Sequence, residues 1–316
     1  DSTFEGRRMR LIQEYFFVSA DVQSIVRHYK ANGMSIYEFG KKIGIHINDT
    51  HPALCVAELM RILVDEEHLT WEDAWAITRD TIAYTNHTIM PEALETWSID
   101  MFQPLLPRIY MIIDEINRRH LEEVRRRYPG NEDKVRALSI IQDGVIHMAR
   151  LSIVGGHSVN GVAKIHTGIL KSTTLKDFYD YTPRKFNNKT NGITHRRWLM
   201  GANPELAALI DEMLGSHKWH RHPEQMDGLY AHVEDKNFLE QLMKIKRLRR
   251  EGLARYIEQH NGVKIDPDSM FDIQVKRIHS YKRQLMNILH IMYRYHRAQS
   301  EPSFLTQPVT YFFGGK

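Results

Sequence analysis

The sequence has a single cysteine, so an intrachain disulfide framework is excluded and a reducing, cytoplasmic compartment is expected. That residue, Cys55, lies inside the apolar run 53–63, which predicts a buried small hydrophobe and not a nucleophile. The sequence also lacks an apolar run long enough to cross a membrane, and no signal peptide is recognisable in it. We therefore expect no membrane partner.

A strong charge of one sign is lacking as well. Lys and Arg number 43 against 39 Asp and Glu, which leaves a net charge of only +4. The small excess is dispersed along the chain, so nucleic acid is not an expected partner. The most basic run, residues 125–127, falls near the end of a predicted helix, where cations are favourable. Internal repeats and low-complexity tracts are not found either.

The composition provides enough apolar side chains for a sizeable core. With 42% hydrophobic residues among 316, one or two domains are expected. Residues 1–190 predict mostly helices with short strands, and residues 191–316 predict helices followed by a strand, a helix and a strand. The turn-rich segment 185–192 is the predicted boundary. Because the sequence begins without methionine and stops in a glycine turn after its last predicted strand, we expect a piece of a longer α/β protein, cut at both ends.

The most informative local feature is a basic turn between a strand and a helix. Residues 271–275 alternate apolar and polar side chains, and residues 283–292 have helical apolar spacing, so Lys276, Arg277 and Lys282 lie between the two elements. A helix N-terminus already carries partial positive charge, so added cations are unfavourable unless an anion binds there. Ligands of open α/β sheets bind beyond the carboxyl ends of strands. The turn therefore predicts a phosphate site; a solvated basic turn is the alternative.

Three other segments place polar residues where packing alone does not require them. Residues 45–52, Ile-His-Ile-Asn-Asp-Thr-His-Pro, predict a strand followed by Asp49 and His51 at a helix entrance. Residues 84–95 place His87 just past a predicted helix end, and residues 189–199 contain Asn191 in a polar loop.

These segments, the basic turn and the glycine-rich stretch 153–171 together closely resemble the α-glucan phosphorylases, the glycogen, starch and maltodextrin phosphorylase family. The resemblance runs in order along the whole chain. It implies a helix-rich glycosyltransferase-B architecture, in which two α/β domains face each other across a cleft. Residues 1–190 would then be part of the N-terminal glucan-binding domain, and residues 191–316 the start of a Rossmann-like cofactor domain.

The resemblance also implies an activity. Enzymes of the family cleave a terminal α-1,4-linked glucose with inorganic phosphate and release glucose 1-phosphate. Their cofactor is pyridoxal 5′-phosphate, whose 5′-phosphate exchanges a proton with the substrate phosphate, whereas its ring is the usual electron sink in other enzymes. The lysine that binds the cofactor covalently would lie outside this chain, so the chain alone is expected to be inactive. The full-length protein would be an allosteric, cytoplasmic homodimer of glycogen catabolism.

The resemblance also implies, position by position, which residues of this chain form the site. Arg277 and Lys282 would hold the substrate phosphate, and Lys276 would contact the cofactor phosphate. Two neighbouring phosphates repel each other strongly in a poorly solvated cleft, so several cations are a physical requirement. Tyr281 would reach a sugar hydroxyl.

The sugar contacts would come mainly from the first part of the chain. His87 would stabilise the developing positive charge on the glucosyl group through its backbone carbonyl. Asn191 would hydrogen-bond the far glucose hydroxyls, and Asp49 and His51 would line the glucose pocket. Asp1 corresponds to an acidic residue in a mobile gating loop of the family.

Two other functions remain as alternatives: a glucan synthase-like nucleotide-sugar transferase, and a catalytically silent glucan-binding or regulatory module. A metal site is not predicted. His46, Asp49 and His51 have the right chemistry for one, but strand alternation turns His46 away from its apolar neighbours, and no cysteine pair accompanies them.

Overall fold

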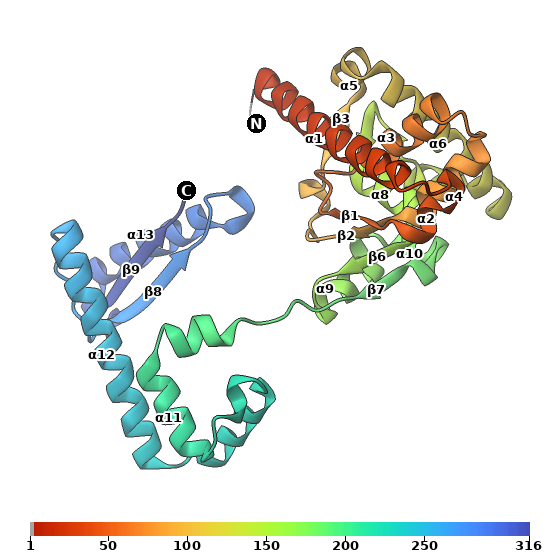
Figure 1. Ribbon diagram of the computed structural model, residues 1–316. Coiled ribbons are helices and arrows are strands. Elements are labelled where there is room, and N and C mark those ends of the chain that lie inside the picture. Colours follow the sequence, from red (N-terminus) through yellow and green to blue (C-terminus); the bar gives the residue numbers. More distant parts are fainter. Residues whose placement is uncertain (1–2) are drawn as a thin grey trace. The chain divides into compact units, whose positions relative to one another are not determined.

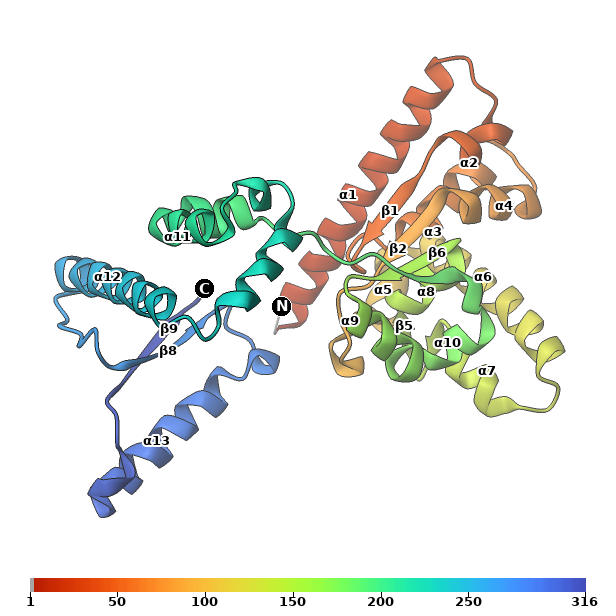
Figure 2. The ribbon, with the colours of Figure 1, turned by 90° about the horizontal axis from the view of Figure 1, so that it is seen from below.

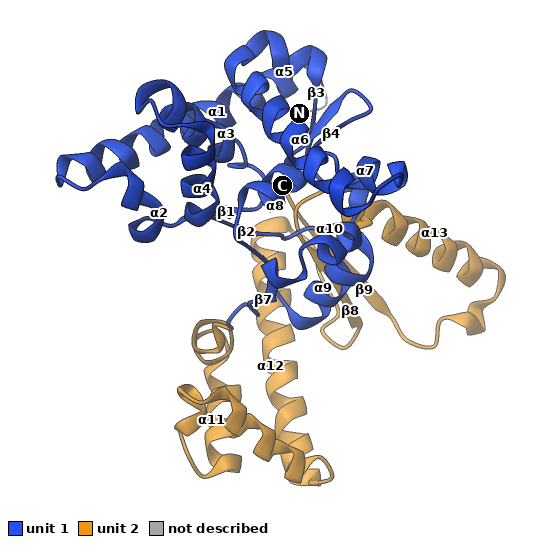
Figure 3. Ribbon diagram, turned by 90° about the vertical axis from the view of Figure 1, so that its right-hand side faces the viewer, with its two compact units in different colours: residues 1–192 blue, residues 193–316 orange. Residues whose placement is uncertain are grey.

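The computed structural model describes residues 3–316, so Asp1, the expected gating-loop residue, lies outside the described residues. The chain divides into two compact units, Asp1–Gly192 and Ile193–Lys316 (Figure 3). Each unit has its own cluster of buried side chains: a large one in the first unit, and a small one in the second around Trp219. Within the described part of the chain, no helix combines the length and apolarity needed to cross a membrane.

A parallel sheet forms the centre of the first unit (Figure 1). It has four strands in the order β1-β2-β6-β7. Their bounds are Ile45–Asn48 for β1, Ile82–Thr85 for β2, Ser158–Gly161 for β6 and Phe186–Asn188 for β7. The register pairs the last residues of neighbouring strands, with Asn48 opposite Thr85 and Gly161 opposite Asn188. The carboxyl ends of all these strands therefore meet at one edge of the sheet.

Helices surround this sheet and supply its crossover connections, as parallel pairing requires. The α-helices of the first unit are α1 (Phe4–Ala31), α2 (Phe39–Lys42), α3 (Cys55–Arg61), α4 (Trp71–Thr81), α5 (Ile99–Leu105), α6 (Pro107–Arg127), α7 (Glu132–Leu138), α8 (Met148–Gly155), α9 (Lys164–Ile169) and α10 (Lys176–Tyr181). The long helix α1 packs on α3 and is seen along its whole length in Figure 2. A small antiparallel sheet, in the order β3-β5-β4, contains β3 (Thr96–Ser98), β5 (Val145–His147) and β4 (Ile141–Gln142).

Several helix boundaries follow from local sequence. Helix α4 begins after Thr70, whose hydroxyl accepts a hydrogen bond from the Asp73 backbone N–H at 3.2 Å. Pro107 is the first residue of α6, where its missing N–H costs nothing. Proline at position 104 also predicts a helix entrance, but Pro104 lies inside α5. Cys55 is buried as predicted, and burial raises the pKa of its thiol to about 12.

Two strands differ from the sequence-based expectation. The segment before His87 is not a helix end, because α4 stops at Thr81 and β2 begins at Ile82. Strand β2 is central and almost wholly buried, so it lacks the alternation that marks a half-exposed strand. Apolar spacing in the sequence alone predicts a single helix over residues 146–154. In the structure these residues are divided between β5 and α8, because β5 pairs with the distant β3.

The second unit contains the predicted strand, helix and strand. Strand β8 (Met270–Val275) pairs in parallel with β9 (Val309–Gly314), and α13 (Gln284–Ser300) connects them. Helix α11 (Pro204–Leu214) carries the small core, and the long helix α12 (Lys236–Asn261) contacts β8 through Arg250, whose guanidinium lies 5.3 Å from the Phe271 ring centroid. The helix-rich α/β class is therefore confirmed.

Candidate functional site

The carboxyl edge of the β1-β2-β6-β7 sheet brings together four of the residues singled out from the sequence. Asp49 and His51 follow β1, His87 follows β2 and Asn191 follows β7. The backbone N–H of Asn191 donates to the carbonyl of Val162 at 2.9 Å, which ties the loop after β7 to the loop after β6. Open α/β sheets bind their ligands at this edge. We therefore take it as the candidate sugar site.

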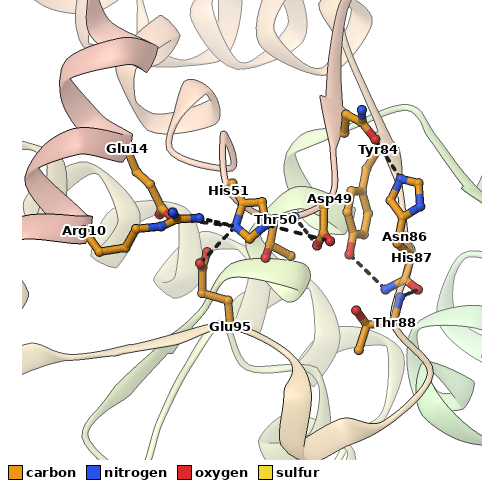
Figure 4. Close-up of polar contacts among 11 residues, drawn as sticks. Arg10, Glu14, Asp49, Thr50, His51, Tyr84, Asn86, His87, Thr88 and Glu95 are labelled. Atoms are coloured by element: carbon orange, nitrogen blue, oxygen red, sulfur yellow. Dashed lines mark hydrogen bonds and ion pairs between the residues drawn. The ribbon is translucent and has the colours of Figure 1, made fainter. Parts of the chain in front are cut away.

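The loop that carries His87 is fixed mainly by its buried neighbour Asn86. The Asn86 backbone N–H donates to the Asn160 carbonyl at 2.9 Å, and its side-chain amide donates to the Tyr84 hydroxyl at 3.0 Å. The side-chain oxygen of Asn86 accepts from the Thr88 backbone N–H at 2.9 Å (Figure 4). These bonds hold the backbone on both sides of His87, whose own side chain is exposed.

Asp49 turns the chain at the end of β1. Its backbone has φ of 63°, the left-handed region that Asp and Asn tolerate best among residues with side chains. Its Oδ1 atom accepts from the Thr50 backbone N–H at 2.7 Å, and its own N–H donates to the Thr85 carbonyl at 3.0 Å. The turn places its carboxylate beside His51, with 3.9 Å between the Oδ2 and Nε2 atoms.

On its other side, His51 contacts a charged cluster that the sequence did not reveal (Figure 4). The Nδ1 atom of His51 lies 3.4 Å from the Arg10 guanidinium, 3.4 Å from Glu95 Oε2 and 3.6 Å from Glu14 Oε1. Arg10 also donates to Glu14 at 2.8 Å. Burial, together with the nearby Glu95 carboxylate, raises the pKa of Glu14 to about 8. The raised pKa favours the protonated form of Glu14 over a wider pH range than for a free carboxyl.

Glu14, His51 and Glu95 also form a geometric metal-ligand set, because their ligand atoms lie within 4.8 Å of one another. The Arg10 guanidinium already occupies this cluster as its cation. A metal ion would have to compete with it, so the donor set fits an ion poorly.

The basic turn of the second unit begins directly after β8. Gln284 donates from its side chain to the Arg277 carbonyl at 2.9 Å, and Gln274 donates to the Lys282 carbonyl at 3.1 Å. These two bonds tie the turn to α13 and to β8. A Cβ atom on Gly315 would lie 2.6 Å from the Lys276 carbonyl oxygen, so only glycine lets the end of β9 approach the turn this closely.

The cations of this turn have no anionic partner within the described part of the chain. The ion pairs of the second unit involve other residues, and none includes Lys276, Arg277 or Lys282. The Lys282 ammonium lies 4.9 Å from the Tyr281 ring centroid, so the ring holds it in a cation–π contact. An unpaired set of cations beyond the carboxyl end of a strand fits a phosphate group, and so it fits the phosphate of a cofactor.

Comparison with known proteins identifies the family. The family described as carbohydrate phosphorylase matches residues 1–316. Glycogen phosphorylase of Bacillus subtilis (strain 168) is 51% identical over 316 residues, which cover 100% of this chain and 40% of that protein. The muscle forms of glycogen phosphorylase from Bos taurus and Homo sapiens are 47% and 46% identical over 327 positions, which cover 100% of this chain and 39% of each relative. The chain thus spans about two fifths of the length of these curated relatives. It belongs to the carbohydrate phosphorylase family.

Proposed function

We propose that the full-length protein containing this chain transfers the terminal α-1,4-linked glucose of glycogen or maltodextrin to inorganic phosphate, giving glucose 1-phosphate. The family supports this reaction, since the relatives named above are glycogen phosphorylases. The observation that carries the proposal is the basic turn at Lys276, Arg277 and Lys282, whose cations form no ion pair among residues 3–316, because phosphorolysis requires an anion site.

In this proposal, Arg277 and Lys282 hold the substrate phosphate. The planar guanidinium of Arg277 can bind two phosphate oxygens at once, while Lys282 is a compact point charge. One such charge pair at 4 Å is worth about 4 kcal/mol at an effective dielectric constant near 20. Lys276 would hold the phosphate of pyridoxal 5′-phosphate, and that phosphate, when bound, supplies a proton donor and acceptor next to the substrate phosphate.

The first unit supplies the sugar contacts in this proposal. The backbone carbonyl of His87 faces the glucosyl carbon and stabilises its positive charge as the glycosidic bond breaks. The position of this carbonyl depends on Asn86, whose buried side-chain amide bonds Tyr84 before His87 and Thr88 after it. This fixed backbone supports the role proposed for the His87 carbonyl. Asn191 binds the far hydroxyls of the glucose, and Asp49 and His51 line its pocket. Tyr281, in the second unit, donates to a sugar hydroxyl.

The remaining assignments rest on the family resemblance. We propose that residues 1–190 belong to a glucan-binding domain and residues 191–316 to a cofactor domain. We also propose a cytoplasmic homodimer under allosteric control. The single buried cysteine supports a reducing compartment.

The test is phosphate-dependent release of glucose 1-phosphate from maltoheptaose by the full-length protein. We expect release that requires inorganic phosphate and pyridoxal 5′-phosphate. Incorporation of glucose from a nucleotide sugar, without phosphorolysis, would instead identify a glucan synthase-like transferase. Glucan binding with neither reaction would identify a silent binding module.

A further inference from the structure

A second cluster of potential ligands lies in the second unit, far along the sequence from the sugar site. Asp211 is in the last turn of α11, His217 follows that helix, and His220 ends the short 3-10 helix Lys218–His220. The Asp211 Oδ2 atom lies 2.9 Å from His217 Nδ1, and its Oδ1 atom lies 3.0 Å from His220 Nε2. One nitrogen from each imidazole and the carboxylate lie within 4.8 Å of one another. We call these three residues the Asp–His cluster.

The local fold builds this cluster by reversing the chain after α11. Gly215 ends the helix in the left-handed conformation, with φ of 59°, and its N–H bonds the carbonyls of Asp211 and Glu212. The N–H of Ser216 also bonds the Asp211 carbonyl, at 3.2 Å. Glycine is favoured at such a helix end because it alone adopts this conformation without steric cost. The reversal returns His217 to the side chain of Asp211.

A buried neighbour holds the Asp211 carboxylate, and a half-buried one holds the backbone of His220. Trp219 is fully buried and donates its indole N–H to Asp211 Oδ1 at 2.8 Å. The backbone carbonyl of His220 accepts a hydrogen bond from His195 Nε2 at 3.0 Å. Metal-binding side chains are usually oriented by such outer hydrogen bonds. Here they hold the Asp211 carboxylate and the His220 segment in place without any ion.

The electrostatics of α11 favour a cation at this point. Asp211 and Glu212 lie at the negative end of the helix dipole, and the last turn carries no basic residue. Within residues 3–316, the ion-pair partners of Asp211 are His217 and His220, and no Arg or Lys is among them. This distinguishes the Asp–His cluster from the cluster around His51, where Arg10 already provides the positive charge.

We propose that the Asp–His cluster binds a divalent transition-metal ion, Zn²⁺ by its chemistry, through Asp211, His217 Nδ1 and His220 Nε2. Two imidazoles and one carboxylate suit zinc and similar ions better than calcium or magnesium. In a tetrahedral zinc site with bonds of 2.0–2.1 Å, ligand atoms lie about 3.3 Å apart. Each imidazole lies slightly closer than this to one of the two carboxylate oxygens, at 2.9 Å from Oδ2 and 3.0 Å from Oδ1, and all three ligand atoms lie within 4.8 Å of one another. Rotation of the exposed His217 side chain would bring the set to tetrahedral spacing. Water completes the fourth position, because the side chain of His217 is 78% exposed.

The ion would cross-link the C-terminal end of α11 to the segment that carries Trp219. That segment and α11 together form the small core of the second unit. The site would therefore stabilise this unit and take no part in the reaction proposed above, on which it does not depend.

The test uses the full-length protein, stripped with a chelator and titrated with Co²⁺, whose absorption spectrum distinguishes four-coordinate from six-coordinate sites. We expect saturable binding with a four-coordinate spectrum that Zn²⁺ abolishes by displacement. His217→Ala and Asp211→Asn should weaken this binding by at least about 100-fold. Trp219→Phe, which removes one supporting hydrogen bond, should weaken it about 10–100-fold.

His222→Ala is the matched control. His222 lies two residues beyond His220 and is exposed, and among residues 3–316 its one acidic ion-pair partner is Glu224, at 3.3 Å. The His222→Ala variant should bind Co²⁺ with unchanged affinity. Equal loss in His222→Ala and His217→Ala would indicate a flexible histidine-rich segment and overturn the proposal. So would unchanged affinity in His217→Ala, a six-coordinate spectrum, or no binding. Circular dichroism of each variant without metal checks folding.

Discussion

The Nε2 atom of His87 lies 2.7 Å from the Oδ1 atom of Asn48, so side chains link the ends of two adjacent parallel strands. An amide oxygen only accepts, which means that His87 donates from Nε2. This bond orients an exposed imidazole at the sheet edge where the glucose pocket is proposed.

A double-mutant cycle on Asn48→Ala and His87→Ala measures this bond. We expect a coupling of about 0.5–1.5 kcal/mol in the free energy of unfolding, the usual net value of one hydrogen bond. Chemical denaturation of the two single variants and the double variant gives the value. Strictly additive effects would contradict the bond.

Asn86→Ala tests whether the backbone of His87 matters more than its side chain. The substitution leaves the Tyr84 hydroxyl without its donor and the Thr88 N–H without its acceptor, and it should cost about 1–3 kcal/mol of stability. A displaced carbonyl should also lower kcat by about tenfold to 100-fold.

His87→Ala is the comparison for that experiment. It removes the imidazole and keeps the carbonyl, so kcat should fall less than in Asn86→Ala. Steady-state rates of glucose 1-phosphate release decide between the two roles. If His87→Ala is inactive while Asn86→Ala retains activity, the backbone role given to His87 is wrong.

Arg277→Ala tests the phosphate site. Loss of one charge contact worth about 4 kcal/mol should lower turnover about 100-fold to 1,000-fold. Cofactor content, measured by pyridoxal phosphate absorbance, should stay near normal because Lys276 remains. Arg255→Ala on α12, an exposed arginine without an ion pair among residues 3–316, is the control and should keep full turnover. Unchanged turnover in Arg277→Ala would refute the role of Arg277.

Glu14→Gln tests the charged cluster around His51. Burial and Glu95 raise the pKa of Glu14 from 4.5 to about 8, so between these values the folded chain holds a proton that the unfolded chain has released. The contribution of this proton to stability is complete below pH 4.5 and is lost as pH rises through about 8.

Glutamine keeps the shape of the side chain, and its amide oxygen can still accept from Arg10, but it does not titrate. The stability of Glu14→Gln relative to the unmodified protein should therefore increase from pH 5 towards pH 8. Urea denaturation across this range measures the difference. A difference that does not change with pH would show that the pKa of Glu14 is ordinary.

Local sequence predicted those parts of the structure whose causes are local. The alternation in residues 271–275 and the later helical spacing gave β8 and α13 because one face of each pattern is apolar. Strand β2 was missed because it is a central, almost wholly buried strand, so apolar and polar residues do not alternate along it. Strand β5 was missed because its partner, β3, is about 50 residues away in the sequence.

In the candidate sites, too, the features with local causes could be predicted from the sequence, and those that depend on distant contacts could not. Asp49, His51, His87 and Asn191 follow strands whose carboxyl ends meet, so their common edge could be anticipated, although their roles remain predictions. The charged partners of His51 could not be anticipated, since α1 and the segment before β3 come together only in the fold. The spacing of Asp211, His217 and His220 was visible in the sequence, but its meaning depends on the turn at Gly215.

The common register of the parallel strands limits where insertions and deletions can be tolerated in this chain. Segments at the opposite edge of the sheet can gain or lose residues without moving a proposed site residue. One residue added inside β2 would shift His87 by one position against Asn48 and turn the following side chains to the other face. Natural insertions and deletions among relatives should therefore gather outside these four strands.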